Sequence, residues 1–374
     1  MKILEGLIVG NEWNYKSDIK QSNGYEDVED ILKSYKTEGF KCKSEDEQSR
    51  LIDEVFNIYR GKNIFPITYY NESGVLNEIK KCYDKQVPKI EDNVLDLKYN
   101  QGSSLCKFLF PNLHSVKCEG ENSRTMYKKF YDDHLLKRAI KLCFSIKNGV
   151  TPSNVRSAME LIGGTVATNY KPMNAKSLYE TYVKEDGVIY DFCGGFGGRM
   201  LGALSSENNY TYITTEPCLE TYDGLLSLGQ YIENIDNKKR FEIYNDCSED
   251  FKYKEKSIDF AFSSPPYYNL EVYSSEPTQC YNKFKDIDSW VEGFIRPTVI
   301  NIYNMLKDDG LLAVNIADFK FRGKVYKLVD KWIKVCEEEG FEFKEQVYMN
   351  LKTRRGVGHN TDITKREGIF IFSK

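Results

Sequence analysis

Four glycines follow an aspartate in the segment Asp191-Phe-Cys-Gly-Gly-Phe-Gly-Gly-Arg199. Apolar residues before this segment predict a buried strand, and ligands of open α/β sheets bind at the carboxyl ends of strands. Gly194, Gly195 and Gly197 let the backbone turn sharply and approach a ligand without an intervening Cβ. Asp191 suits a ligand that carries a free amino group. The Gly-Lys-Ser/Thr of a Walker loop is missing, and Met200 departs from the G-x-G-x-x-G pattern. A glycine-rich connection without a ligand is the alternative.

Acidic residues follow the next two predicted strands. Glu216 closes the second strand, where a carboxylate can accept both hydroxyls of a ribose. Asp246 and Cys247 lie in the turn after the third strand, where they are placed to meet an adenine amino group. Solvated turn residues are the simpler reading of each acid alone. Together with the glycine turn they predict a site for an adenosine that carries an amino-acid-like tail, without a phosphate cradle.

The segment Ser263-Ser-Pro-Pro-Tyr-Tyr268 directly follows the fourth predicted strand. Pro265 and Pro266 remove two backbone donors and fix φ, which leaves the backbone carbonyl groups free to accept hydrogen bonds. Ser264 and the Pro265 carbonyl can both accept hydrogen bonds from a substrate NH2 group. Tyr267 offers a flat face to a heterocycle, a contact worth about 1–3 kcal/mol per stacked base. A rigid strand exit without a substrate is the alternative for this segment.

These segments resemble motifs of S-adenosylmethionine-dependent amino-methyltransferases, which act on exocyclic nitrogens, chiefly in DNA. Asp191–Gly197 is similar to motif I (D-x-F-x-G-x-G), Ser264–Tyr267 to motif IV ([DNS]-P-P-[YFW]), and Asn169–Pro172 with Ala175–Tyr182 to motif X. The resemblance covers Asn169 to Lys374. It implies S-adenosylmethionine as cofactor, S-adenosylhomocysteine as product, and a cofactor site that includes Asn169, Tyr170, Lys171, Asp191, Cys193, Gly194, Gly195, Gly197, Glu216, Asp246 and Cys247.

The resemblance also implies a mechanism. Glu216 would hold the ribose, Asp246 the adenine, and Asp191 with the glycine turn the methionine end of the cofactor. The catalytic segment Ser264, Pro265, Pro266 and Tyr267 would direct the target nitrogen at the methyl group, so that transfer is a direct displacement helped mainly by positioning. Neither a metal nor a covalent intermediate is required. A base in duplex DNA must leave the stack to reach this site.

The target and the partners are less constrained by these residues. Serine at position 264 is commoner in cytosine-N4 enzymes and aspartate in adenine-N6 enzymes, so cytosine is slightly favoured. RNA or a protein glutamine is the alternative substrate, although those groups usually carry asparagine there. A catalytically silent binding module of the same fold is a further alternative. A second copy of the chain or a restriction enzyme is a possible protein partner, and we expect no membrane partner.

Alternation of strands and helices after residue 160 predicts an α/β fold. Together with the resemblance it implies a Rossmann-like class I methyltransferase sheet with seven strands, mostly parallel, and an antiparallel last strand. The strands are expected at Gly187–Phe192, Tyr210–Thr215, Phe241–Asn245, Ile258–Ser263, Leu311–Ile316, Phe341–Met349 and Ile369–Phe372. Helices are expected between them at Arg199–Ser205, Leu219–Ile235, Ile287–Leu306 and Val325–Glu339.

The N-terminal part lacks this alternation. Helical patterns cover Tyr25–Tyr35, Glu45–Tyr59, Gly74–Lys85, Arg124–Phe144 and Thr151–Leu161. We therefore expect a mainly helical domain over residues 1–162 and a catalytic domain over residues 163–374. Because motifs I and IV leave no room between them for a recognition domain, target recognition is expected in the N-terminal part.

The charge balance excludes a globally basic surface. The 374 residues carry a net charge of -4, and the pI is about 5.7. A base-flipping enzyme needs only one cationic groove, and binding through a few cations is expected to be modest and salt-sensitive. Candidate phosphate contacts are Lys128, Lys129, Lys137, Arg138, Lys141 and Lys147. Candidate substrate-binding residues are Tyr268, Asn269 and Tyr273 after motif IV, and Arg354 and Arg355 in the loop before the last strand.

Ten scattered cysteines without a C-x-x-C pair argue against a disulfide framework and a ribbon-type zinc site. Cys106, His114 and Cys118 have poor metal-ligand spacing, so no metal is expected. No apolar run reaches the ~18–20 residues that span a bilayer. The first residues do not read as a signal peptide. A cytoplasmic protein is the expectation.

Overall fold

The computed structural model describes residues 25–95, 97–118, 124–146, 149–321, 323–350 and 366–374. The chain forms two compact units: Met1–Ser73 with Leu113–Ala167, and Gly74–Asn112 with Thr168–Lys374. The second unit contains the main sheet. Residues 74–112 thus belong with the sheet, whereas the sequence analysis placed them in the N-terminal part.

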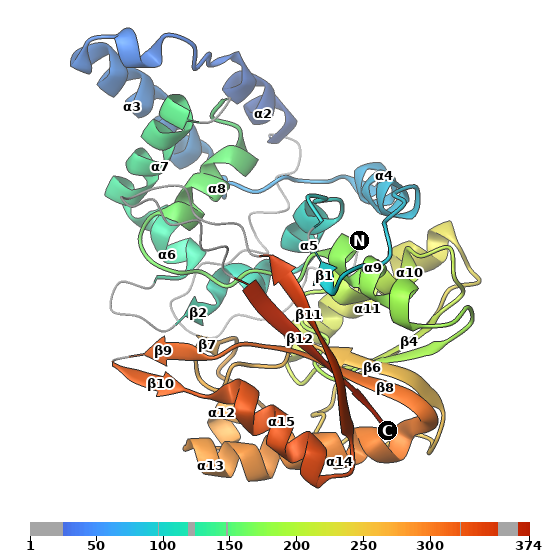
Figure 1. The fold of residues 1–374 in the computed structure, drawn as a ribbon. Coiled ribbons are helices and arrows are strands. Elements are labelled where there is room, and N and C mark those ends of the chain that lie inside the picture. Colours follow the sequence, from blue (N-terminus) through green and yellow to red (C-terminus); the bar gives the residue numbers. More distant parts are fainter. Residues whose placement is uncertain (1–24, 96, 119–123, 147–148, 322, 351–365) are drawn as a thin grey trace. The chain divides into compact units, whose positions relative to one another are not determined.

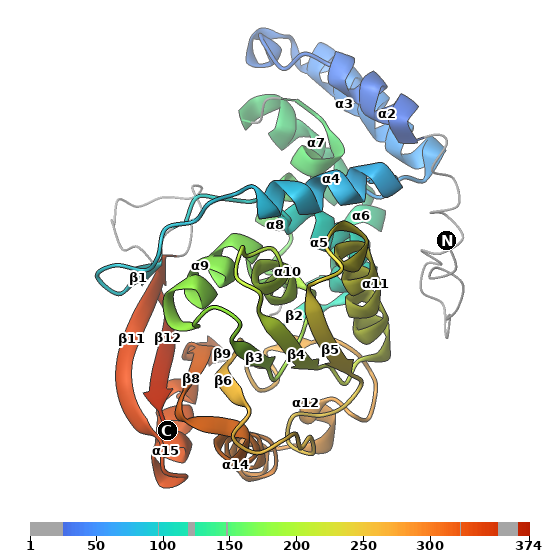
Figure 2. The same ribbon diagram turned by 90° about the vertical axis from the view of Figure 1, so that its right-hand side faces the viewer.

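The main sheet has eight strands in the order β1-β11-β12-β8-β6-β3-β4-β5 (Figures 1 and 2). Neighbouring strands are parallel except β12, which is antiparallel to both β11 and β8. The mostly parallel sheet with its antiparallel last strand confirms the predicted Rossmann-like fold, and the short edge strand β1 is an eighth strand beyond the seven predicted. The bounds are β1 Val94–Leu95, β3 Val188–Asp191, β4 Thr211–Thr215, β5 Arg240–Tyr244, β6 Ile258–Ser263, β8 Leu306–Ile316, β11 Glu342–Asn350 and β12 Arg366–Ser373.

Helices cover both faces of the sheet. Figure 2 shows α9 (Pro172–Tyr182), α10 (Gly198–Leu204) and α11 (Leu219–Ile235) on one face, and α14 (Arg296–Met305) and α15 (Leu328–Glu338) on the other. Trp290, Phe294 and Trp332 form the centre of the second face together with Tyr190 and Leu312 of the strands. Both faces of the strands are therefore buried, which explains their nearly continuous apolar sequences.

This unit contains further helices and short strands outside the main sheet. They are α4 (Glu72–Tyr83), α5 (Ser103–Leu109), α12 (Cys280–Lys283), α13 (Ile287–Trp290) and the strands β7 (Glu271–Val272), β9 (Phe319–Phe321) and β10 (Lys324–Tyr326). Strands β9 and β10 pair as an antiparallel hairpin. The predicted helix Val325–Glu339 is therefore wrong at its start, because Val325 and Tyr326 pair with Lys320 and Phe319.

Lysine 176 explains why residues 74–112 belong with the sheet. Its ammonium group donates to the carbonyl oxygens of Cys82 (3.1 Å), Tyr83 (3.2 Å) and Lys85 (2.9 Å), at the end of α4. The side chain is buried, and this burial lowers its pKa. Three carbonyl acceptors satisfy the amine that α9 would otherwise bury unpaired.

The first unit is helical, as predicted. Its helices are α2 (Tyr25–Ser34), α3 (Glu45–Lys62), α6 (Met126–Tyr131), α7 (Asp133–Ile146) and α8 (Pro152–Leu161), with 3-10 turns at Phe40–Cys42 and Pro111–Ser115 and the strand β2 (Lys117–Cys118). The predicted helix Arg124–Phe144 breaks in two, because the Asp132 side chain accepts a hydrogen bond from Leu135 N and caps α7.

Two candidate phosphate contacts have other partners in this unit. The Lys129 side chain is buried, and its amine donates to the carbonyl oxygens of Met159 (3.2 Å) and Gly164 (2.7 Å), so its assignment to phosphate is corrected. Lys137 forms an ion pair with Asp53 at 2.7 Å. Among the described residues, no helix combines the length and apolar character needed to cross a membrane.

Candidate active site

The predicted motifs meet at one edge of the sheet because β3, β4, β5 and β6 are parallel and end there. Hydrogen bonds join the segments that follow these strands. Gly194 N donates to Thr215 O (2.9 Å), and Glu216 N donates to Tyr244 O (3.0 Å). The Ser263 hydroxyl donates to Cys193 O at 3.2 Å. The glycine turn is thus in direct contact with the start of the Ser-Pro-Pro-Tyr segment.

Asp191 is fully buried, and both of its carboxylate oxygens have partners. Arg199 Nε and the Tyr212 hydroxyl donate to Oδ2 at 2.7 and 2.6 Å, and Cys193 N donates to Oδ1 at 3.3 Å. Arg199 also donates to Cys193 O. Asp191 therefore holds the glycine turn from behind, whereas the sequence analysis assigned it to the amino end of the ligand.

Glycine is required for different reasons at different positions of the turn: close packing at some and a left-handed backbone at others. A Cβ on Gly198 would lie 2.0 Å from Tyr170 O, so the turn packs directly on the segment before α9. Gly195 has φ +56°, and its Cβ would meet nothing closer than Arg199 at 3.6 Å. Of the glycines predicted to bind the cofactor, Gly195 is the one where a Cβ would fit without a clash, because a Cβ on Gly194 or Gly197 would lie within 3 Å of other side chains.

The motif X segment packs on the glycine turn. Asn169 Nδ2 donates to Phe196 O at 2.7 Å. The Tyr170 ring lies edge-on to Phe262 of β6, with the centroids 5.5 Å apart. The Tyr170 hydroxyl is buried without a hydrogen-bond partner in the described part of the chain. Lys171 precedes α9, and its amine donates to Leu97 O at 3.4 Å.

Glu216 is a buried carboxylate between the glycine turn and the start of α11. Its Oε2 accepts from Gly195 N and its Oε1 from Cys218 N, both at 2.9 Å. Burial raises its pKa to about 7, against the lowering effect of these two backbone donors. Each carboxylate oxygen can accept a second hydrogen bond. The geometry therefore suits a ligand with two neighbouring hydroxyl groups, as the sequence predicted for a ribose.

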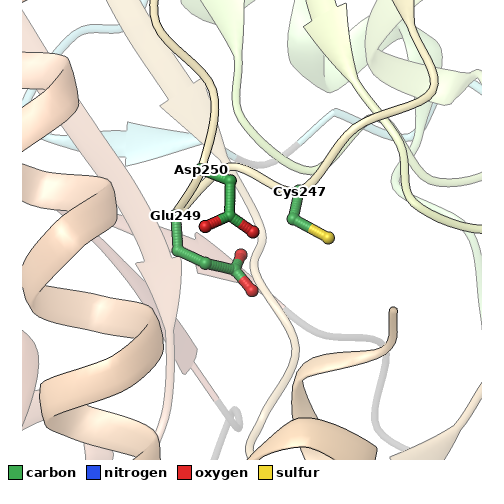
Figure 3. A group of neighbouring side chains, drawn as sticks. All are labelled: Cys247, Glu249 and Asp250. Carbon is green, nitrogen blue, oxygen red and sulfur yellow. The ribbon is translucent and has the colours of Figure 1, made fainter. Parts of the chain in front are cut away.

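The turn after β5 is shaped by its own side chains. Asp246 is exposed, and its Oδ1 accepts from Cys247 N at 2.8 Å. The Cys247 thiol is buried and donates to Thr278 O at 3.5 Å. Figure 3 shows Cys247 beside Glu249 and Asp250, three groups near enough to hold a metal. The Lys283 amine instead binds both carboxylates, at 2.7 and 2.9 Å, and supplies the positive charge.

The Ser-Pro-Pro-Tyr segment leaves β6 at the same edge. Ser264 and Pro266 are half-buried, and Pro265 is buried. The half-buried Tyr267 donates its hydroxyl hydrogen to Glu367 on β12. Sequence reasoning missed Glu367, since an isolated glutamate in a strand forms no pattern.

Tyr268 has a structural role and not the predicted role in substrate binding. Its φ of +56° is uncommon for a bulky residue. This conformation turns the ring into the core, where it lies edge-on to Trp290 with the centroids 5.6 Å apart. The hydroxyl donates to Lys285 O at 2.9 Å. A buried ring with its hydroxyl satisfied is unavailable to a substrate.

The other predicted substrate residues differ in their surroundings. Asn269 Oδ1 is buried without a partner in the described ranges. The Tyr273 ring lies 6.1 Å from the Phe196 ring of the glycine turn, and its hydroxyl donates to Glu271. Tyr273 is thus beside the cofactor motif. Arg354 and Arg355, together with Lys352 and His359, lie outside the described residues.

Comparisons with known proteins identify no sequence family. No family model matches the chain, and no curated protein matches it. The solved structures that match include methyltransferases of low identity. A TehB-like S-adenosylmethionine-dependent methyltransferase from Corynebacterium glutamicum is 15% identical, with a TM-score of 0.33, over 59% of this chain and 94% of that one. The 1,6-didemethyltoxoflavin N1-methyltransferase of Burkholderia thailandensis is 10% identical, with a TM-score of 0.36, over 54% and 77%.

A third match is a Thermus thermophilus protein provisionally described as a DNA modification methylase. It is 18% identical with a TM-score of 0.25, over 33% of this chain and 47% of that one. At these identities and TM-scores the matches carry no evidence about function, which must be argued from the site of this chain.

Proposed function

We propose that the protein transfers a methyl group from S-adenosylmethionine to the exocyclic amino group of a base in DNA, with cytosine N4 slightly favoured over adenine N6. The observation that carries the proposal is the hydrogen bond from Ser263 to Cys193 O. It joins the segment suited to a substrate NH2 group to the turn suited to the cofactor. Two sites in contact are what a direct group transfer requires.

The residues at the sheet edge fit the cofactor in part. Glu216 would accept the two ribose hydroxyls, and Gly195 would let the backbone approach the ligand. Asp246 is exposed beside the same edge and would meet the adenine. Asp191 would act only indirectly, by holding the turn through Arg199. When bound, the cofactor supplies an activated methyl group on a sulfonium ion.

The chain's own contribution to transfer is positioning. Ser264 Oγ and Pro265 O would accept the two hydrogens of the target amino group, which leaves the nitrogen lone pair free to point at the methyl group. Tyr267 would stack on the extruded base, a contact worth about 1–3 kcal/mol. For duplex DNA this stacking partly offsets the cost of unstacking the base, a few kcal/mol.

We further propose that the helical unit recognises the target. No segment between the glycine turn and the Ser-Pro-Pro-Tyr segment forms a separate domain, since β4, α11, β5 and β6 occupy it. Exposed cations such as Lys128, Arg138 and Lys141 remain candidates for phosphate contacts, unlike the buried Lys129. Few contacts of this kind predict DNA binding that weakens steeply with salt.

The test is to offer the purified protein methyl-labelled S-adenosylmethionine with DNA, RNA and protein fractions in parallel. We expect label in DNA, in a form that digestion releases as a base methylated on its amino nitrogen. Label in RNA or in glutamine would replace the DNA proposal with one of those substrates. Calorimetry without cofactor binding would instead favour a silent binding module.

A further inference from the structure

The hydroxyl of Tyr267 donates to a carboxylate oxygen of Glu367, exactly one hundred positions along the chain. Glu367 lies at the start of β12, where it pairs with Met349 of β11. The next residue, Gly368, pairs with Ile316, the last residue of β8. Since β12 is antiparallel to β8, the start of β12 lies at the carboxyl edge of the parallel strands. Glu367 therefore shares the edge on which the Ser-Pro-Pro-Tyr segment lies.

Glu367 is partly shielded from solvent. Its side chain is half-buried, and burial raises the pKa of its carboxyl group to about 7. Among the described residues, the Tyr267 hydroxyl donates to this carboxylate. The charge of Glu367 also acts on Tyr170, whose own pKa is raised mainly by burial and further by Glu367. Arg199 lies beyond Tyr170, with its guanidinium carbon 5.8 Å from that ring.

The hydrogen bond to Glu367 restrains the hydroxyl end of the Tyr267 ring, which is otherwise fixed only through its backbone. Tyr267 follows two prolines, so its backbone is stiff, but rotation about its side-chain bonds must still be restricted. A hydrogen bond from the phenol to a carboxylate restricts both torsions at once. Hydrogen bonds to an ionised acceptor are stronger than those between neutral groups.

We propose that Glu367 is a positioning residue that fixes the Tyr267 ring in the orientation that stacks on the target base. The proposal rests on the proposed function, because it names the group that organises the same substrate site. Glu367 acts through Tyr267 and need not touch the substrate. The anchor is strongest when the carboxyl group is ionised, so base stacking is held more firmly as the pH rises through neutrality.

The first test is a double-mutant cycle with DNA as substrate, using Tyr267→Phe, Glu367→Gln and both together. Phenylalanine keeps the ring face and removes the hydrogen bond, and glutamine keeps the shape and a neutral acceptor. We expect each single change to lower kcat/KM about 10-fold or more, the effect of losing a charged hydrogen bond. The double variant should be no worse than Tyr267→Phe alone. Effects that multiply would overturn the proposal, as would wild-type kinetics for both single variants.

A pH profile separates positioning from general packing. With S-adenosylmethionine held at saturation, so that the titration of Glu216 does not affect the rate, the wild-type kcat/KM for DNA should rise with pH near 7, and this step should disappear in Glu367→Gln. Tyr253→Phe is the matched control. The Tyr253 hydroxyl also donates to a glutamate, Glu242 on β5, at a distance of 2.9 Å, and this pair is not part of the segment after β6. The control should keep the wild-type rate and profile. A step that persists in Glu367→Gln would assign the titration to another group and remove the role of Glu367.

A second readout does not need activity. In the full chain with 13C-labelled glutamate, the Glu367 carboxyl resonance, assigned through Glu367→Gln, should titrate at a higher pH in Tyr267→Phe, since the carboxylate loses a donor. An unchanged titration would overturn the contact itself. A shifted titration in a protein that methylates no DNA would instead contradict the proposed function, and the stacking role with it.

Discussion

Arg199 Nε donates to Asp191 Oδ2 at 2.7 Å, and both side chains are buried. The pair lies behind the glycine turn, since Arg199 also donates to Cys193 O at the start of that turn. The acid that ends β3 thus shapes the loop, and its predicted contact with a ligand amine stays a prediction. The Asp191–Arg199 pair therefore has a structural role in motif I. It fixes the glycine turn, and Gly195 of this turn donates to Glu216.

Asp191→Asn should destabilise the sheet-containing unit by about 3–5 kcal/mol, because it leaves the Arg199 charge buried without its counter-charge. Urea unfolding followed by fluorescence measures this, since Trp290 and Trp332 are buried in that unit. Asp309→Asn is the control, because it breaks an exposed ion pair with Lys184. An Asp191→Asn variant as stable as the control would contradict the structural role of the pair.

Glu216 should make stability depend on pH. Its pKa is about 7 in the folded protein against an ordinary 4.5, so between these values the folded state binds more protons than the unfolded state. Stability should therefore fall as the pH rises from about 4.5 through 7, by up to about 3 kcal/mol. Unfolding midpoints across this range, compared with Glu216→Gln, measure the effect.

The same group should link cofactor binding to protons. Hydroxyl donors favour the ionised carboxylate, so binding near pH 6 should release protons and become tighter as the pH rises. Calorimetry in buffers of different ionisation enthalpy detects this release. Because Glu367 has a similar pKa, Glu367→Gln serves as the comparison, and it should leave the proton release intact. Equal release from Glu216→Gln would exclude the assignment to Glu216.

Two glycines of the turn should respond differently to alanine. Gly198→Ala places a Cβ 2.0 Å from Tyr170 O and should cost about 3 kcal/mol or more in stability. Gly195→Ala makes only van der Waals contacts of 3.6 Å or more, so its cost is that of a left-handed backbone, about 1–2 kcal/mol. Gly195→Ala should nevertheless weaken cofactor binding. Thermal unfolding together with calorimetry distinguishes the two, and unimpaired binding by Gly195→Ala would remove it from the site.

Adjacent tyrosines should separate stability from activity. Tyr268→Ala removes a ring packed on Trp290 and should cost about 3–5 kcal/mol in stability. Tyr267→Ala should lower methyl transfer with a much smaller loss of stability, because this ring is only half-buried. Urea midpoints and initial rates, measured on the same preparations, test both. The opposite pattern would return Tyr268 to the substrate site.

Sequence patterns were sufficient for seven of the eight strands of the sheet, and they missed the two-residue edge strand β1. Each predicted strand is present, because buried parallel strands are short apolar runs between turns. Helix continuity was harder to predict. The expected helix Ile287–Leu306 contains a π-helical turn at Val291–Ile295 before α14 begins at Arg296, and it ends where β8 starts at Leu306. The spacing of apolar residues does not reveal a local change from α-helical to π-helical hydrogen bonding.

Contacts between distant residues limited what could be said of the site. The positions of Glu216 and Ser264 follow from strand ends, which are readable in the sequence. The partners of Asp191 and Tyr267 depend on which side chains the packed sheet brings together. Arg199 had a signal, since an arginine in the first turn after a glycine loop is near the preceding strand end. Glu367 had none, and neither did the association of residues 74–112 with the sheet.

The most direct test of the central claim is sequencing of modified bases in DNA from cells that express either the wild-type protein or the Ser264→Ala, Tyr267→Ala double variant. We predict a base methylated on its amino nitrogen with the wild type and none with the double variant, although the variant still binds cofactor. Equal modification by both proteins, or unmodified DNA from cells with active wild-type protein, would contradict the account.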